Sequence, residues 1–173
     1  MKKTYKFLLR HIGSHLPDPS EWGGNFKICQ KIRNRWARKI APGISNKANI
    51  CRGARILGDG ENLIIEEHSP IGINCKVGSN LFIGKHTMMA PNCTILTENH
   101  VFDKETMQFE GEETKHVSIG HHCWIGERVM ILPGARIGNY CIIGAGSVVP
   151  GKDYPDYSLI AGNPASIRKS IEH

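Results

Sequence analysis

The sequence predicts a solenoid, a parallel β-helix, and two regularities predict it. An aliphatic residue recurs at every sixth position from Ile71 to Ile95, and the same six-residue spacing resumes in phase from Ile119 to Val149. A small or compact side chain follows four positions after most of these residues, as at Cys75 and Ala135. A strict six-residue period is typical of a hexapeptide repeat, in which each unit forms one short strand and one corner.

The repeat specifies how each unit packs. The aliphatic residue and the small residue both point into a narrow prism, and three units complete one coil, so equivalent positions recur every eighteen residues. Gly follows many of the aliphatic residues, where we expect it to permit corner angles that a side chain would resist. Coils should stack at about 4.8 Å and share their stability with their neighbours.

The N-terminal segment, residues 1–43, is predicted to be helical and basic. Tyr5 to His15 can form a short helix that ends near Gly13, and Lys27 to Ile40 forms a second one before Pro42 and Gly43. The second helix carries an apolar row at helical spacing, made of Ile28, Ile32 and Trp36. We expect this segment to cover the open end of the solenoid.

Positive charge is concentrated in the first forty residues, which hold ten Lys or Arg and only Asp18 and Glu21 as acids, within a net charge of +6 for the chain. A solvated helical face explains this, and so does an arm attracted to an anionic membrane or to a phosphate-bearing substrate. No nucleic-acid motif is present. No apolar run is long enough to span a membrane or to serve as a secretory signal, so we expect a cytoplasmic protein.

The solenoid is predicted to span residues 44–150. Ile44, Ile50 and Ile56 keep the beat, whereas Leu57 to Ser69 slips out of phase, which we interpret as an irregular corner. Residues 101–116 are polar and form a loop that leaves the coil and returns in register. Regular coils need no such excursion, so the loop is a candidate functional element. Residues 151–173 are expected to form a turn-rich exit and then a helix after Pro164.

The cysteines are explained by the repeat. Cys75 and Cys93 are eighteen residues apart and both occupy the small inward position, as do Cys123 and Cys141. Buried free cysteine behaves as a small hydrophobic residue. Core packing is therefore favoured over a disulfide or a metal site.

One histidine lies at the point where the chain leaves the coil. His100 ends the last coil before the loop, so rigid backbone holds it and solvent reaches it. Imidazole titrates near neutral pH and can act as a general base. A lone histidine among nine is a weak signal without further context.

The motifs around His100 resemble those of a known family. They are Ala90-Pro91-Asn92 with Asn99-His100, Ile119 to Gly126, Leu132-Pro133-Gly134, Ile143 to Val149 and Ala161-Gly162-Asn163-Pro164-Ala165. Together they resemble the hexapeptide-repeat acyltransferases, and within them the O-acetyltransferases of galactosides, maltose and surface polysaccharides. The resemblance implies a left-handed coil, a homotrimer and an acetyl-CoA donor bound between neighbouring subunits, with no metal.

The resemblance also assigns roles to residues of this chain. It implies that His100 takes the proton of the acceptor hydroxyl, beside Asn99, and that Trp124 lies where acceptor and thioester meet. Donor contacts are implied for Trp124, Gly126, Ala145, Lys152, Arg168 and Lys169, the last three near the nucleotide. Outer-face packing is the alternative for Trp124, and simple solvation is the alternative for the basic residues.

The acceptor side departs from the sugar enzymes. Asp18 does not match their acidic acceptor contact, and Pro70 falls near the position of an acceptor-binding Asn. We expect a sugar hydroxyl as the acceptor, in surface polysaccharide biosynthesis. The basic N-terminal segment favours a lipid-linked or phosphate-bearing glycan.

Three alternatives stay open. The chain could be a metalloenzyme of the β-helix carbonic anhydrase type, with His116 and His121 joined by His86 or His68. It could be an acyltransferase for a small non-sugar acceptor, or a non-catalytic β-helix scaffold.

Overall fold

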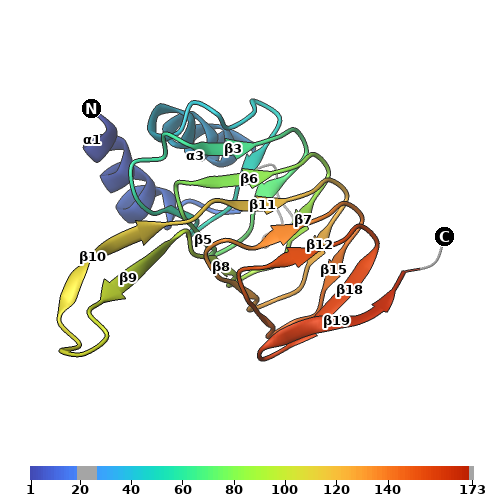
Figure 1. Cartoon of the computed structure of the whole chain (residues 1–173). Helices are drawn as coiled ribbons and strands as arrows, with labels where there is room; N and C mark the ends of the chain where they lie inside the picture. Colours follow the sequence, from blue (N-terminus) through green and yellow to red (C-terminus); the bar gives the residue numbers. More distant parts are fainter. Residues whose placement is uncertain (19–26, 172–173) are drawn as a thin grey trace.

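A three-sided prism of short parallel strands forms the body of the protein, in a computed structural model that describes residues 1–18 and 27–171. Helices cover one end of the prism, and a two-stranded hairpin projects from one of its edges (Figure 1). The predicted parallel β-helix is confirmed.

Each coil visits three faces in a fixed order. The first face contains β3 (Leu63–Ile65), β6 (Leu81–Ile83), β11 (Val117–Ile119), β14 (Arg136–Ile137) and β17 (Asp153–Tyr154). The second contains β1 (Asn49–Ile50), β4 (Pro70–Ile71), β7 (Met88–Met89), β12 (Trp124–Ile125), β15 (Ile142–Ile143) and β18 (Ser158–Gly162). The third contains β2 (Arg55–Ile56), β5 (Lys76–Val77), β8 (Thr94–Ile95), β13 (Met130–Ile131) and β16 (Val148–Val149).

The interior is filled by the residues of the six-residue beat. Ile125 lies opposite Met89 and Ile143 on the neighbouring coils, so like positions stack on like. The four predicted inward cysteines are buried and free. The backbone N–H of Cys93 donates to Sγ of Cys75 over 3.3 Å, and hydrogen bonding with Cys93 and burial raise the pKa of the Cys75 thiol. The thiol is therefore a neutral packing group, as predicted.

The repeat glycines serve close approach of coils, so the reason given from the sequence was wrong. A Cβ on Gly126 would lie 2.6 Å from the backbone nitrogen of Ala145 on the next coil, far inside contact distance. Left-handed angles occur instead at non-glycine residues of the corners, such as His122 with φ 56° and Asn92 with φ 63°. Glycine is needed because the backbones touch.

The irregular corner lies where the phase slips. Ile56 and Ile65 are nine residues apart instead of six, so the corner between β2 and β3 holds three additional residues before the ladder resumes. At the other end the ladder continues past the predicted limit of residue 150. β17 pairs with β14, and β18 pairs with β15, which adds strands of a further coil.

The predicted C-terminal helix is wrong. Residues Ala165–Ser170 form strand β19, which pairs antiparallel with β18 from Gly162 opposite Ala165 to Ser158 opposite Ser170. A last coil would otherwise present an open row of backbone donors and acceptors. Local helical preference is outweighed because the returning strand satisfies that edge.

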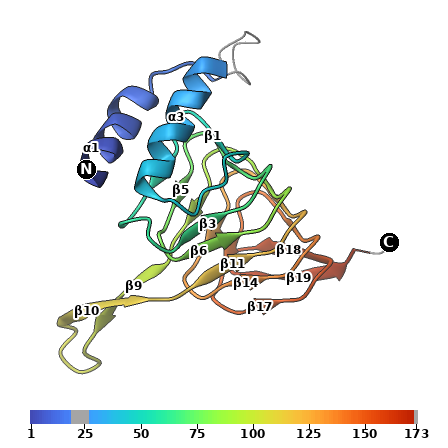
Figure 2. The ribbon, with the colours of Figure 1, turned by 90° about the horizontal axis from the view of Figure 1, so that it is seen from above.

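Helices close the opposite end. α1 (Lys2–Phe7) runs into a π-helical turn, η1 (Leu8–Gly13), and α3 (Lys27–Ile40) lies beside them over the first coil (Figure 2). The predicted cover of the open end is therefore present. Glu21 of the basic segment lies outside the described residues.

The buried face of α3 differs from the predicted apolar row. Ile28 is 65% exposed, and the buried residues are Arg33, Asn34, Ala37 and Ile40. The amide of Asn34 donates to the carbonyl of Ala48 over 3.1 Å and accepts from the N–H of Ile50 over 2.8 Å. Polar side chains occupy the side of α3 that packs on the first coil, because backbone groups of that coil need hydrogen-bond partners that a purely apolar helix could not supply.

Asp18 has a structural role. Its carboxylate lies 2.8 Å from Nη2 of the fully buried Arg33 and accepts the backbone N–H of Arg52 over 3.0 Å. Nε of Arg33 donates to the carbonyl of Ile50. A buried charge pair is tolerated when its remaining donors and acceptors are satisfied, as they are here.

The loop is an ordered hairpin that begins earlier than predicted. β9 (Glu98–Phe102) and β10 (Phe109–Thr114) pair antiparallel and extend away from the prism in both views (Figures 1 and 2). The backbone N–H of Lys115 donates to the carbonyl of Thr97 over 2.8 Å, which closes the base of the hairpin. Within residues 1–18 and 27–171, no helix has the length and apolar character that a membrane crossing requires.

Candidate functional site

His100 lies on β9, near the base of the hairpin, and faces a carboxylate on the other strand. It is the register partner of Glu112, and its Nδ1 lies 3.8 Å from Oε1 of that residue. The ring also packs edge-on against Phe109, with ring centroids 5.4 Å apart. The hairpin thus holds an exposed imidazole in a defined orientation, with a negative group on one side.

A small hollow of about 150 Å³ lies beneath this pair. Its lining is Leu57, Gly78, Leu96, Thr97, Glu98, His100 and Glu112. Thr97 is 2% exposed, and its hydroxyl has no hydrogen-bond partner within the described ranges. Leaving a buried hydroxyl without a partner costs about 1–3 kcal/mol, so the unpaired group of Thr97 beside this hollow calls for an explanation.

Glu112 and Thr97 were not identified from the sequence. Glu112 lies twelve positions after His100, and only the antiparallel pairing of the hairpin brings them together. The available signal was the pair Phe102 and Phe109 on either side of a short polar segment, which is compatible with a hairpin. Asn99 pairs with Glu113, and because neighbours on a strand face opposite sides, its side chain leaves the face that holds His100.

Trp124 lies on the second face, in one outward row with Met88 and Ile142. It is 52% exposed, and Met88 beside it is 60% exposed. A row of large exposed apolar side chains on a flat face is unusual for a surface in contact with water only. Within one chain this face does not include the hairpin, so Trp124 and His100 are not brought together.

Gly126 and Ala145 stack on each other at the corner between the second and third faces. The N–H of Gly126 donates to the carbonyl of Ile143 over 2.9 Å, and Ala145 is exposed on the next coil. Nε of Arg168 donates to the carbonyl of Ala161, which continues the same corner one coil further. These three predicted donor contacts form one line along an edge of the prism.

The other two basic residues lie apart from that line. Lys152 sits at the corner between the third and first faces, with Nζ 5.4 Å from the ring centroid of Tyr154. Lys169 pairs with Leu159 in the last hairpin. His100 and Lys152 thus occupy one edge of the third face, while Gly126 and Ala145 occupy the other. The residues predicted for the base and for the donor thus form two predicted half-sites on opposite edges of one face.

The alternative metal set does not assemble. Nδ1 of His116 lies 3.0 Å from Oδ1 of Asn80, and His121 packs edge-on against Tyr140. In the part of the chain that the structure describes, no group of three His, Cys, Asp or Glu side chains could hold a metal ion.

His68 and His86 belong to a different feature, a ladder of stacked rings along the corner between the first and second faces. The ladder consists of His68, His86, His122, Tyr140 and Tyr157. Adjacent ring centroids are 4.9 to 5.2 Å apart, which matches the rise per coil. The pKa of His122 is lowered, first because stacking removes water from its ring and then because of the nearby charges of His86, His121 and Lys85.

Comparison with known proteins agrees with this architecture. The model of the family described as bacterial transferase hexapeptide (six repeats) matches residues 116–151. A protein of Escherichia coli K12, whose name assigns it to lipopolysaccharide biosynthesis as an O-acetyl transferase, is 37% identical over 100 residues. That alignment covers 53% of this chain and 50% of the relative.

Two solved structures resemble the whole chain. A maltose O-acetyltransferase from Clostridium difficile 630 has a TM-score of 0.76 at 28% identity and covers 99% of this chain and 85% of its own. A galactoside acetyltransferase in complex with coenzyme A has a TM-score of 0.68 at 27% identity, with 99% and 79% covered. The chain spans about half the length of the first curated relatives that it matches.

Proposed function

We propose that this chain, which belongs to the hexapeptide-repeat acyltransferase family, transfers an acetyl group from acetyl-CoA to a hydroxyl group of a sugar. One observation carries the proposal. His100 is held on a hairpin opposite Glu112, above a hollow lined by Thr97, whose buried hydroxyl has no partner among the described residues. The relatives named O-acetyltransferases, and the structure of a galactoside acetyltransferase with coenzyme A, support the choice of reaction and donor.

His100 acts as the general base. Its Nε2 takes the proton of the acceptor hydroxyl while the oxygen attacks the thioester carbon, and the carboxylate of Glu112, 3.8 Å from Nδ1, stabilises the imidazolium that forms. The tetrahedral intermediate carries a negative oxygen, to which the hydroxyl of Thr97 donates. Collapse breaks the carbon–sulfur bond, and the thiolate of CoA receives the proton from the imidazolium. Acid–base catalysis contributes about 10²–10⁴-fold, and positioning supplies much of the rest.

The active assembly is a homotrimer. The half-sites of one chain lie on opposite edges of the third face, so a second copy is needed to place Gly126 and Ala145 near His100. Exposed Met88 and Trp124 provide apolar area for such a contact. Trp124 then lies at the groove where the acceptor meets the thioester, while Lys152, Arg168 and Lys169 lie towards the nucleotide and Asn99 towards the acceptor.

The setting is surface polysaccharide biosynthesis at the cytoplasmic side of a membrane, where acetyl-CoA is available. The exposed Lys3, Lys27, Lys31, Arg35 and Lys39 of the helical end are placed to meet anionic lipid headgroups. Sedimentation with vesicles that contain phosphatidylglycerol tests this contact, which should weaken as salt is raised. Equal binding to neutral vesicles would contradict it.

The decisive experiment compares His100→Ala with His116→Gln. With acetyl-CoA and a panel of sugars, His100→Ala should lower kcat by about 10²–10⁴-fold without unfolding the protein, because it removes the base. His116→Gln should retain the kcat of acetyl transfer. The carbonic anhydrase alternative predicts instead that the parent hydrates carbon dioxide and transfers no acetyl group, and that His116→Gln loses the hydration activity. Full turnover by His100→Ala would refute the assignment. Turnover with only small non-sugar alcohols would favour the second alternative.

A further inference from the structure

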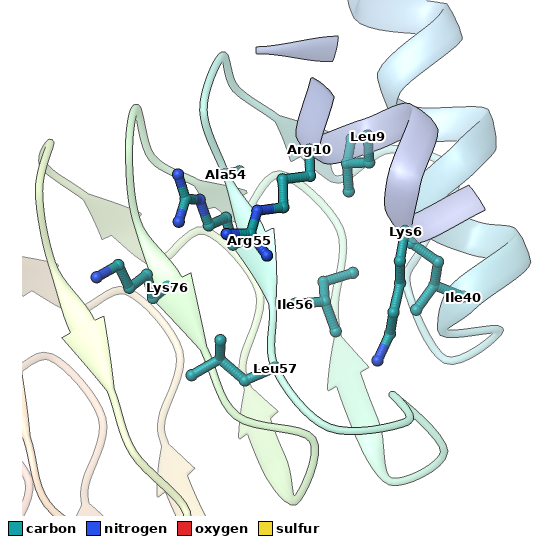
Figure 3. A pocket seen from close by; sticks show the side chains of 9 residues that line it. All are labelled: Lys6, Leu9, Arg10, Ile40, Ala54, Arg55, Ile56, Leu57 and Lys76. Carbon is teal, nitrogen blue, oxygen red and sulfur yellow. The ribbon is translucent and has the colours of Figure 1, made fainter. Parts of the chain in front are cut away.

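A second hollow lies between the helical end and the third face, and no described acid lines it. Its volume is about 430 Å³, and its lining is Lys6, Leu9, Arg10, Ile40, Ala54, Arg55, Ile56, Leu57 and Lys76. Four of these nine residues are cations. Figure 3 shows Arg10 on the helical segment reaching towards Arg55 on β2, while Lys6 extends beside Ile40 on the other side of the hollow.

The sequence spacing and the strand register hold these cations together. Lys6 and Arg10 are four residues apart on the helical segment and so lie on one side of it. Arg55 and Lys76 are register partners on the parallel strands β2 and β5, so their side chains stand next to each other. Neighbouring like charges on a sheet repel each other unless an opposite charge lies between them.

The rest of the described molecule pairs many of its cations with acids. Examples are Lys2 with Glu61, Lys47 with Glu67, Lys115 with Glu113 and Arg136 with Asp153. Within the described ranges, no carboxylate lies within ion-pair distance of the four cations that line the hollow. The hollow is therefore a concave site with a concentrated positive charge and an apolar floor of Leu9, Ile40 and Ile56.

This basic hollow adjoins the hollow beneath His100. Leu57 lines both, and Gly78, which follows Lys76 after β5, lines the smaller one. The charge changes sign between them, because Glu98 and Glu112 border the smaller hollow. A single ligand that spans both would therefore have a neutral hydroxyl-bearing end near His100 and an anionic end among the cations.

We infer that the basic hollow binds the phosphate of a phosphorylated sugar acceptor while one of its hydroxyls reaches His100. This inference rests on the proposed function, and it names the acceptor class of the same site. The phosphate could belong to a free sugar phosphate, a nucleotide sugar or a lipid-linked sugar diphosphate. Donor phosphates are expected elsewhere, because Gly126, Ala145 and Arg168 lie on later coils, away from β2 and β5.

The test measures acetyl transfer from acetyl-CoA to galactose, galactose 1-phosphate, UDP-galactose and a prenyl-diphosphate-linked galactose. We expect a KM at least about tenfold lower for one phosphorylated acceptor than for galactose, since a charge-assisted hydrogen bond is worth a factor of ten or more. The best of the three phosphorylated substrates identifies the source of the phosphate. Raising the salt concentration should increase that KM and leave the KM for galactose unchanged.

Variants locate the effect. Arg55→Gln and Lys76→Gln should each raise the KM for the phosphorylated acceptor about tenfold and leave the KM for galactose and acetyl-CoA unchanged. Lys85→Gln, an exposed cation at the corner between the first and second faces and outside the hollow, is the matched control and should change neither. Equal KM values for galactose and its phosphates, with no effect of Arg55→Gln, would overturn the inference, as would a raised KM for acetyl-CoA.

Calorimetric titration with inorganic pyrophosphate separates the two proposals. Binding that Arg55→Gln weakens, in a protein that shows no acetyl transfer, would support the anion site and count against the proposed function. Acetyl transfer to neutral sugars without any pyrophosphate binding would support the proposed function and refute the anion site. A solvated basic surface without a ligand site predicts no saturable binding to the parent and no difference between Arg55→Gln and the Lys85→Gln control.

Discussion

Replacing Thr97 by Val should make the protein less active without making it less stable. The hydroxyl is buried and has no partner among the described residues, and leaving such a group unpaired costs about 1–3 kcal/mol. Valine has nearly the same shape and no hydroxyl, so the variant should match the parent in stability or exceed it by about 1 kcal/mol. That gain corresponds to a rise in Tm of roughly 2–4 °C for a chain of this size.

The activity should move in the opposite direction. Loss of one hydrogen-bond donor to a developing oxyanion lowers kcat by about 10²–10³-fold, so Thr97→Val should fall within that range while its KM for acetyl-CoA stays constant. Thr97→Ser keeps the hydroxyl and should recover most of the rate. Thermal unfolding and release of the CoA thiol, measured on the same preparations, provide both quantities.

Thr87 offers a matched control for the same substitution. It is fully buried, but its hydroxyl donates to the carbonyl of Gly120 over 2.7 Å. Thr87→Val should therefore lower stability by about 1–3 kcal/mol, because it leaves that carbonyl without this donor, and the folded protein should keep its kcat. A destabilised Thr97→Val with unchanged kcat would refute the reasoning, since it would show that the hydroxyl is structural.

Two further predictions concern the scaffold. Gly126→Ala should lower the free energy of unfolding by about 1–3 kcal/mol, because the new Cβ would overlap Ala145, and a denaturant midpoint equal to that of the parent would contradict it. The pKa of His122 is lowered in the folded state, so its contribution to stability is complete above the unfolded value of about 6.5 and is lost as the pH falls. Denaturant midpoints between pH 8 and pH 5 should fall less in His122→Gln than in the parent, and identical pH profiles would exclude this contribution.

The sequence predicted the solenoid because the six-residue repeat reflects one interaction, the stacking of each inward residue on the equivalent residue of the neighbouring coil. Ile71, Ile83 and Ile95 each face inward as predicted, and the cysteines pack as small core residues. His100 was expected at the end of the last coil, whereas it lies inside the hairpin, on β9. Its role, with those of the donor-binding residues, stays a prediction.

The failures occurred where the backbone of a neighbouring element decides the outcome. Arg33 and Asn34 are buried because backbone carbonyls of the first coil accept hydrogen bonds from them. The apolar periodicity of α3 contains no sign of these hydrogen bonds. Ala165–Ser170 is a strand because β18 has an open edge. Pairing across the hairpin places Glu112 beside His100, and the basic hollow needs two segments that only the folded chain brings together.

The bond between Lys115 and Thr97 has a consequence for how such a protein changes over time. The chain enters and leaves the projecting hairpin at adjacent points, so the strands on either side already continue one another. Insertions, deletions or exchange of residues 98–114 therefore leave the stacking of the coils untouched. The hairpin can therefore change in length and sequence during evolution, while the coils of the prism keep their six-residue repeat.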